Sequence, residues 1–211
     1  MIGRISWITS RRFAERYPFP NSRWTLEMPA LKYIPNYTVQ EYRQWEGDWE
    51  LWDGIPVSMS PNLLHRHSPF GRHQWAATSI ASAIKQQLDE LDCADCYVLM
   101  ETDWNINQRT VVRPDLSVCC GAFPEKFIES APALVVEVLS ESTADKDKHS
   151  KRLLYESEGV SDYLMLDLIA ERFIHYQLDS GAYIEQPSDE PVLITLHPGC
   201  RVELSVPKMK K

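Results

Sequence analysis

The chain has 211 residues, of which 44% are hydrophobic and 25% are charged, and its formal net charge is −8. This length suits one domain with a substantial core, and the acidic balance excludes a general nucleic-acid coat protein, which needs a large basic surface. No apolar run approaches the roughly 20 residues of a membrane span, and residues 1–20 lack the continuous apolar stretch of a secretory signal, so we expect a cytoplasmic protein without membrane contact.

The domain boundaries are predicted from where hydrophobic periodicity begins and ends. Residues 1–36 contain several prolines and no sustained period, and we interpret them as an N-terminal extension. Residues 37–206 are predicted to form the single domain, and residues 207–211 a basic tail.

The first elements of the domain are predicted to be a short helix and a β-hairpin. Thr38 and Glu41 form a capping-box pattern at a helix start. Asp53-Gly54 is a strong hairpin signal between two short apolar strands. Glu50 alternates with apolar neighbours on the first strand. It lies either on a solvated strand face or beside a site as an auxiliary carboxylate.

A long helix follows the hairpin. Ser68-Pro69 has the pattern of an N-cap followed by proline at the first helical position. The buried stripe consists of apolar residues spaced by three and four positions, namely Ala77, Ile80, Ile84, Leu88 and Leu91. His73 falls on the same stripe near the start of the helix. It is either a hydrogen-bonded structural histidine or a residue that lines a site.

The next three strands are predicted over residues 96–104, 111–119 and 133–140. A polar turn over residues 105–110 is predicted between the first two. Side chains alternate along the second strand, so Asp115 falls on a polar face. The third strand has aliphatic residues on both faces, as is typical of a central strand. Glu137 lies in its middle, where an ionised carboxylate costs several kcal/mol unless a partner or a metal compensates it.

The next helix is predicted over about residues 145–157, and Gly159 is placed to end it. Asp147, Lys151 and Tyr155 recur at i, i+4 and i+8, so they share one face of this helix. Short strands are predicted after it, at about 163–166, 171–178 and 182–185 and within 192–206. The order of elements indicates an α/β fold with a mixed sheet.

Five cysteines without a regular framework argue against a secreted disulfide scaffold. Cys93 and Cys96 form a C-x-x-C pair, but a zinc site needs two more ligands. The neighbours Cys119 and Cys120 point in opposite directions on a strand, and no histidine pair has zinc-finger spacing. We therefore do not predict structural zinc.

Asp115, Glu137 and Lys151 are the candidates for a catalytic site. If their strands are neighbours, the carboxylates of Asp115 and Glu137 converge, and with the main-chain carbonyl of Val138 they offer the hard oxygen ligands that suit Mg²⁺, with Mn²⁺ as a substitute. Such an ion supports phosphodiester hydrolysis. Lys151 would orient or deprotonate the attacking water, or neutralise charge at phosphorus. Phosphate contacts are expected from a small basic zone of Lys146, Lys148, Lys151 and Arg152.

Several segments resemble the restriction endonuclease family of Uma-two type, within the PD-(D/E)XK nuclease superfamily. They read RPDLSV, LVVEVLSESTADKDKHSK and Y-x-x-x-GV-x-DY-x-x-x-D. The resemblance covers about residues 37–182, because spaced motifs occur in the right order: Tyr37-Thr38, Glu50-Leu51-x-Asp53-Gly54, Pro61 with His73-Gln74, Pro114-Asp115, Glu137-Val138-x-Ser140, Asp147 with Lys151, and Gly159-Val160.

The resemblance implies a restriction endonuclease-like fold, in which helices flank a central mixed sheet, and a metal-dependent endonuclease acting on DNA. It assigns Asp115 and Glu137 to the metal. The superfamily pattern places a catalytic lysine two residues after the glutamate, where this chain has Leu139, and the family places it on the following helix, where this chain has Lys151. Trp52 departs from the usually aliphatic hairpin motif.

Further expectations concern the rim of the site and the assembly. Glu50 and His73 are auxiliary candidates at the rim, and Asp147 is a candidate to position Lys151. A homodimer is expected by analogy, since cutting both strands of a duplex usually takes two sites. Two other interpretations stay open, a catalytically inactive module that binds nucleic acid or protein, and a purely structural ion-pair network. DNA or RNA preference does not follow from the fold.

Overall fold

The computed structural model of the chain describes residues 35–59, 71–139, 146–187 and 190–208, and for residues 146–148 it describes the backbone only. The predicted N-terminal extension lies almost entirely outside these ranges. The compact unit that contains the described residues is Pro35–Lys211. Among the described helices, none is long and apolar enough to cross a bilayer.

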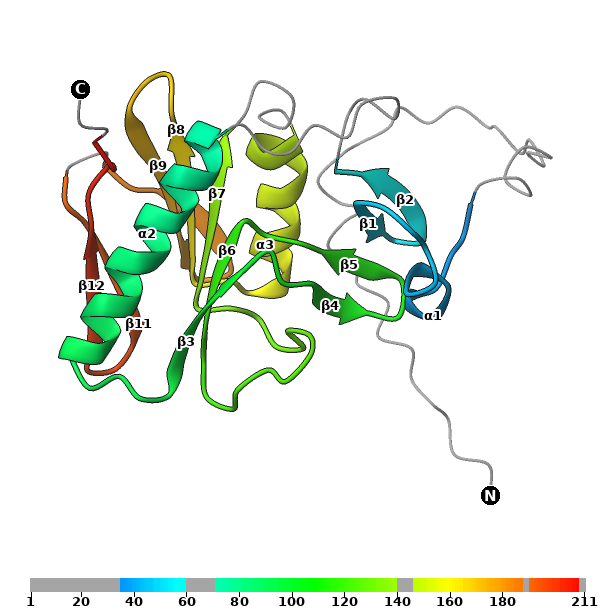
Figure 1. The fold of residues 1–211 in the computed structure, drawn as a ribbon, viewed down its shortest axis with the longest axis horizontal. Coiled ribbons are helices and arrows are strands. Elements are labelled where there is room, and N and C mark those ends of the chain that lie inside the picture. The colour runs from blue at the N-terminus through cyan, green and yellow to red at the C-terminus, as the bar shows by residue number, and fades with distance from the viewer. Residues whose placement is uncertain (1–34, 60–70, 140–145, 188–189, 209–211) are drawn as a thin grey trace. The chain divides into compact units, whose positions relative to one another are not determined.

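A six-stranded mixed sheet forms the centre of the described structure (Figure 1). Its order is β10-β9-β8-β7-β6-β3, in which β7 and β8 run parallel and the other neighbours antiparallel. The strands are β3 (Cys96–Met100), β6 (Leu116–Cys120), β7 (Leu134–Leu139), β8 (Asp162–Asp167), β9 (Arg172–Asp179) and β10 (Ala182–Glu185). Every residue of β7 is buried, as predicted for a central strand. The α/β fold with a mixed sheet is therefore confirmed.

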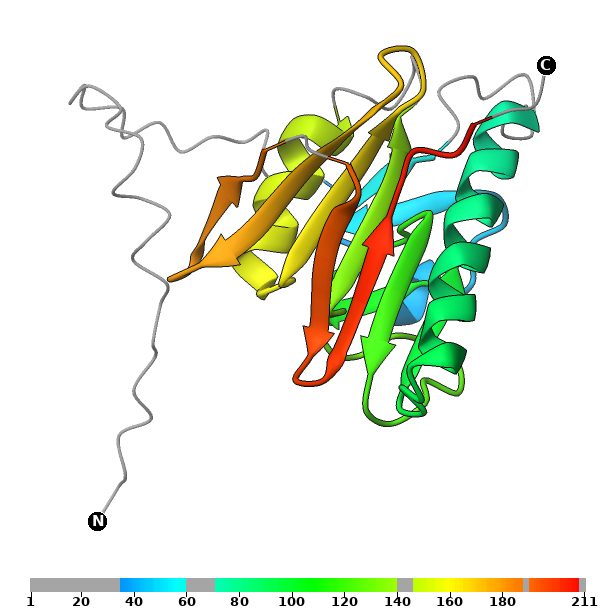
Figure 2. The same cartoon turned by 90° about the vertical axis from the view of Figure 1, so that its left-hand side faces the viewer.

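Different elements cover the two faces of this sheet (Figures 1 and 2). Helix α2 (Gly71–Glu90) and the hairpin of β11 (Val192–His197) and β12 (Cys200–Leu204) share one core with the sheet. Helix α3 (Arg152–Glu158) shares the other core. Side chains of β7 alternate between the two cores, with Val136 in the first and Val135 in the second. Glu137 therefore points into the layer that contains α3.

A smaller antiparallel sheet has the order β2-β1-β5-β4, and its strands are β1 (Trp49–Trp52), β2 (Ile55–Ser58), β4 (Trp104–Asn107) and β5 (Thr110–Val112). The predicted hairpin is confirmed, since Trp52 pairs with Ile55 across the turn. Asp53 and Gly54 both have positive φ, 46° and 82°, which is the conformation that this tight turn requires.

The short helix α1 (Val39–Tyr42) begins as predicted. The Thr38 hydroxyl accepts from the Glu41 N–H, and the Glu41 carboxylate accepts from the Thr38 N–H at 2.8 Å. This reciprocal capping box satisfies two N–H groups at the helix start. The buried side chain of Tyr42 then packs with Leu51 of β1.

Two predictions for residues 105–119, one of a turn and one of a strand, are wrong because the chain crosses between the two sheets here. The strand predicted over residues 111–119 is divided into β5 and β6, since Pro114 has no N–H to continue a ladder. The turn predicted over residues 105–110 contains most of β4, because buried Trp104 and its neighbours pair with β5 despite their polar composition. The division leaves Asp115 immediately before β6.

The two longer helices follow the predicted patterns with local differences. The predicted stripe of α2 is buried except for Leu91, which lies beyond the end of the helix and is 48% exposed. Ser68-Pro69 lies outside the described residues. The helix predicted from residue 145 begins instead as a π-helix, η2 (Lys146–Lys151), before α3. Gly159 ends α3 at φ 82°, as predicted for a C-cap.

Two disulfides join elements at one end of the larger sheet, which the odd cysteine count did not predict. Cys96 of β3 bonds to Cys120 of β6, and Cys93 in the turn before β3 bonds to Cys200 of β12. Cys119 carries the only unpaired thiol among the described residues.

Candidate active site

Asp115 and Glu137 face each other across the pairing of β6 with β7. The register places Leu116 opposite Val136, so the preceding residue Asp115 meets Glu137. The N–H of Val138 donates to Asp115 Oδ2 at 2.7 Å, and the N–H of Asp115 donates to Glu137 Oε2 at 3.4 Å. The expectation that two neighbouring strands bring these carboxylates together is confirmed.

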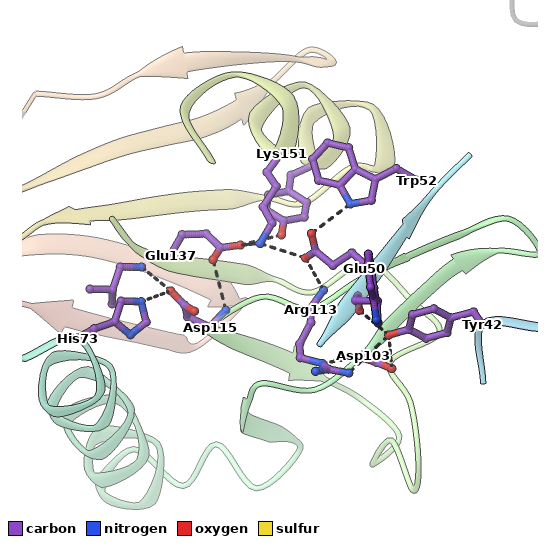
Figure 3. A network of polar contacts seen from close by, with 12 residues as sticks. Tyr42, Glu50, Trp52, His73, Asp103, Arg113, Asp115, Glu137 and Lys151 are labelled. Carbon is purple, nitrogen blue, oxygen red and sulfur yellow. Dashed lines mark hydrogen bonds and ion pairs between the residues drawn. The ribbon is translucent and has the colours of Figure 1, made fainter. Parts of the chain in front are cut away.

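Lys151 lies between two carboxylates (Figure 3). Its Nζ atom is 2.7 Å from Glu137 Oε1 and 3.3 Å from Glu50 Oε1, and its side chain is 3% exposed. The hydroxyl of Tyr155, one turn further along α3, also donates to Glu137 Oε1 at 2.9 Å. Lys151 therefore belongs to the interior of the site, and its contact with phosphate as part of the small basic zone stays a prediction.

Glu50 is fully buried, so the solvated-face alternative for this residue is wrong. Its Oε2 accepts from Trp52 Nε1 at 3.1 Å, and its Oε1 accepts from the Arg113 N–H at 2.9 Å. These donors and Lys151 compensate the loss of water around a buried carboxylate. Glu50 lies on the opposite face of β1 from its apolar neighbours, as the alternation predicts, but this face packs on the site and not against solvent.

His73 reaches the site from the first turn of α2. Its Nε2 atom lies 3.2 Å from Asp115 Oδ2. Burial alone would lower the pKa of His73, but the Asp115 carboxylate and the backbone of Val138 outweigh it and raise this pKa above its ordinary value. His73 thus lies at the rim of the site, where its auxiliary role remains a prediction.

Asp115 is held in its ionised form despite its surroundings. Burial would raise its pKa, but His73, Lys151 and the N–H of Val138 together lower it. The side chains of Asp115 and His73 are 19% and 14% exposed, whereas those of Glu137 and Glu50 are 2% and 0% exposed. Solvent therefore reaches the site on the side of Asp115 and His73.

The donor chemistry of the site fits a hard divalent cation. Glu50 and Glu137 contact the ammonium of Lys151, and Asp115 contacts the imidazole of His73, so three carboxyl groups lie beside two basic side chains. Three carboxylates outnumber the two basic groups even when His73 is protonated, so the set carries excess negative charge, which an ion with oxygen ligands would offset. The carboxylates of Asp115 and Glu137 therefore fit the predicted ion, and the carbonyl of Val138 as a third ligand stays a prediction.

Asp147, the candidate to position Lys151, lies outside the described side chains, and its role stays a prediction. The i, i+4 spacing of an α-helix does not describe Asp147 and Lys151, because both lie in the π-helix η2, whose hydrogen bonds connect i to i+5. Tyr155 instead is the neighbour of Lys151 that contacts Glu137. Its position four residues after Lys151 was the sequence signal for this role.

A second polar group braces the site and had no sequence signal, because its members are distant along the chain. Arg113 Nε donates to Asp103 Oδ1 at 2.7 Å, and the hydroxyl of Tyr42 donates to Asp103 Oδ2 at 3.1 Å. Burial, followed by the charge of Asp103, raises the pKa of Tyr42. This group fixes the segment whose Arg113 N–H binds Glu50 (Figure 3).

Comparisons with known proteins agree with this architecture. The model of the Uma2 family, described as "Putative restriction endonuclease", matches residues 39–207. "Uncharacterized protein slr1290" of Synechocystis sp. is 26% identical over 163 residues, which cover 72% of this chain and 80% of that protein. The crystal structure of a "putative nuclease belonging to DUF820" from Anabaena variabilis has a TM-score of 0.62 at 15% identity, and the match covers 81% of this chain and 95% of that chain.

The structural likeness shows a restriction endonuclease-like fold, as the resemblance implied. The family match runs from α1 to the residues after β12 and thus includes every element that contributes to the site. The chain therefore belongs to the Uma2 family.

Proposed function

We propose that the protein is a Mg²⁺-dependent endonuclease that hydrolyses phosphodiester bonds of DNA. The observation that carries the proposal is the convergence of Asp115, Glu137 and Lys151 from three separate elements into one buried site. The description of the Uma2 family supports the same class of activity.

Asp115 and Glu137, with the Val138 carbonyl, would hold the metal ion. When bound, Mg²⁺ supplies Lewis acidity toward a phosphoryl oxygen and acidifies a water molecule. The protein's own contribution is to keep both carboxylates in place before substrate arrives. The Val138 N–H fixes Asp115, and the Tyr155 hydroxyl fixes Glu137. Such supporting hydrogen bonds orient ligands and tune them.

Lys151 would act on the attacking water or on the charge that develops at phosphorus. Its contacts with Glu137 and Glu50 hold the ammonium at a defined place beside the facing carboxylates. A preorganised cation at that place needs little reorganisation during reaction, which is the main advantage of electrostatic catalysis. The phosphodiester would approach from the side of Asp115 and His73, where the site is open to solvent.

Cleavage of plasmid DNA in the presence of Mg²⁺ or Mn²⁺ tests the proposal. We expect the wild-type protein to nick and linearise the plasmid, and Asp115→Ala, Glu137→Gln and Lys151→Ala to reduce the rate by about 100-fold or more. Asp162→Asn is the matched control, because this buried carboxyl is hydrogen-bonded to His175 at 2.7 Å and is not among the residues that converge on the site. Activity that persists in all three site variants would overturn the proposal.

Calorimetric titration with Mn²⁺ separates an enzyme from an inactive module of the same fold. The enzyme should bind the ion in the wild-type form and lose binding in Asp115→Ala and Glu137→Gln. A module in which Lys151 already neutralises Glu137 should bind no metal.

We further propose that the protein acts as a homodimer, since a two-fold assembly presents one site to each strand of a duplex. Light scattering during gel filtration measures the mass that decides this.

A further inference from the structure

A second cluster of metal-ligating side chains lies away from the candidate active site. It consists of four cysteines and one histidine, Cys93, Cys96, Cys120, His197 and Cys200, and is called the cysteine cluster below. The ligand atoms of Cys93, His197 and Cys200 lie within 4.8 Å of one another, and so do those of Cys96, Cys120 and His197. The imidazole of His197 is therefore close to all four sulfur atoms.

The first arm of the cysteine cluster is the C-x-x-C turn between α2 and β3. The N–H of Cys96 donates to the carbonyl of Cys93 at 3.1 Å, which closes a tight turn between the two cysteines. Both residues are buried and belong to the core shared by α2 and the sheet. A tight turn with two cysteines three positions apart is how many zinc sites supply half of their ligands.

The second arm is the turn of the β11–β12 hairpin, which has the sequence His-Pro-Gly-Cys. His197 and Cys200 pair across it, and Gly199 has φ 92°, a conformation that a residue with a side chain rarely adopts. This turn again places two ligand groups three positions apart. The nearest carboxylate oxygen, Asp95 Oδ1, lies 3.2 Å from His197 Nε2. A carboxylate in this place orients an imidazole beside a metal site.

Cys120 completes the cysteine cluster from the end of β6. It lies directly opposite Cys96 in the pairing of β3 with β6. The two additional ligands that a lone C-x-x-C lacks are therefore present, although they are distant in sequence. Cys119, the neighbour of Cys120, points into the opposite core and takes no part.

We propose that the cysteine cluster, with both disulfides reduced, binds one Zn²⁺ through the thiolates of Cys93, Cys96, Cys120 and Cys200. Thiolates are the ligands that zinc prefers, and four sulfurs at about 2.3 Å from the ion give the closed tetrahedral set of a structural site. Sulfur atoms in such a set are about 4 Å apart. Each of the four sulfurs lies within 4.8 Å of the same imidazole, that of His197, and reduction lets the two sulfurs of each bonded pair move apart. The active-site carboxylates are instead hard oxygen ligands that suit Mg²⁺.

The two forms of the cysteine cluster are related by simple chemistry. A phosphine gives two electrons to each disulfide and is oxidised to the phosphine oxide, whose oxygen comes from water. The S–S bond breaks, and the two sulfurs take up the two protons of that water to become thiols. Zinc binding then releases the four thiol protons. Either form links the turn before β3, the end of β6 and the β11–β12 hairpin, so zinc would replace the disulfides in a reducing compartment.

Zinc content of the full-length protein tests the proposal. The protein is reduced with a phosphine, loaded with zinc and dialysed, and zinc is measured by mass spectrometry. Glu137→Gln serves as the background, so that zinc at the candidate active site does not contribute. We expect one zinc per chain in this background and in the added control Cys119→Ala, and less than about a tenth as much in Cys93→Ser/Cys200→Ser. Substitution with Co²⁺ should give a sulfur-to-metal charge-transfer band.

Two results would overturn the proposal. One is a reduced protein whose thiols are all titratable but that retains no zinc. The other is equal zinc in the control and in Cys93→Ser/Cys200→Ser, which would place the ion elsewhere. If the double variant does not fold, the Co²⁺ spectrum of the Cys119→Ala control still decides, because oxygen ligands give no such band.

Discussion

The Nζ atom of Lys151 lies 2.7 Å from Oε1 of Glu137, and the helix end that carries it is thereby fixed to the central strand of the sheet. Lys151 stands 14 positions after Glu137 along the chain, yet the fold brings the two side chains into contact. A catalytic ion pair and a purely structural one share this geometry. They differ in how the protein responds when one charge is removed.

Glu137→Gln distinguishes these two roles in the absence of metal. The amide oxygen can still accept from Lys151 and Tyr155, while one of three neighbouring carboxylates is removed. For an active site, we expect the melting temperature in EDTA to stay constant or to rise by a few degrees, because repulsion between carboxylates is relieved. A loss of about 3 kcal/mol or more, measured by urea denaturation, would instead indicate a structural ion pair.

Removal of Lys151 should have the opposite effect on stability. Lys151→Met leaves Glu50 and Glu137 buried without their cation, so we expect the free energy of unfolding to fall by about 3–5 kcal/mol. Adding Glu50→Gln should restore part of that stability and none of the nuclease activity. Denaturant unfolding and plasmid cleavage measure the two quantities. Restored activity in the double variant would show that Lys151 has no role in the reaction.

Tyr155→Phe tests the hydrogen bond that Tyr155, the first residue of the Y-x-x-x-GV motif, donates to Glu137. Phenylalanine keeps the ring contacts of Tyr155 with Trp104 and Tyr163 but loses the hydroxyl that donates to Glu137. We expect a stability loss of about 1–3 kcal/mol, because a buried acceptor loses a donor. Cleavage should slow by about 10-fold, as for other residues that support a metal ligand. Tyr176→Phe, which removes an exposed hydroxyl bonded to Glu185, is the control.

Cys119 should differ from the other cysteines in its reactivity. Burial raises the pKa of its thiol to about 11, and the thiolate is the reactive form. After reduction without metal, we expect Cys120, the one half-buried cysteine of the five, to react first with an alkylating reagent at pH 8, and Cys119 to react last, only on unfolding. The raised pKa favours the folded state below the ordinary value of 9.0, and this contribution is lost as pH rises toward 11. Peptide mass spectrometry identifies the late site.

The sequence predicted those parts of the site that depend on local pattern. Alternation placed Glu137 in a central strand, and the hairpin and capping box were visible because their residues are adjacent in sequence. The burial of Glu50 could not be predicted in this way. It results from the packing of β1 against β5, and the partner that donates to its Oε1, Arg113, is 63 positions away.

The errors have the same origin. The composition of residues 105–107 is polar, yet pairing with β5 makes them a strand. The pattern of residues 111–119 is continuous, yet Pro114 ends one ladder, and the next residues join another sheet. In the cysteine cluster, the hairpin of β11 and β12 places Cys200 next to Cys93, although the two residues are 107 positions apart in the sequence. Long-range pairing of this kind leaves no trace in a local window.

Strand β6 carries Asp115 just before its first residue and Cys120 at its end. At about 3.3 Å per residue, these two positions are about 17 Å apart, so one short strand runs from the candidate catalytic centre to the cysteine cluster. A slip of one residue between β3 and β6 would move the Glu101 N–H away from the Asp115 carbonyl, to which it donates at 3.2 Å. The bond between Cys96 and Cys120 forbids that slip. The covalent chemistry at one end of the sheet thus fixes a backbone contact that supports Asp115 at the other.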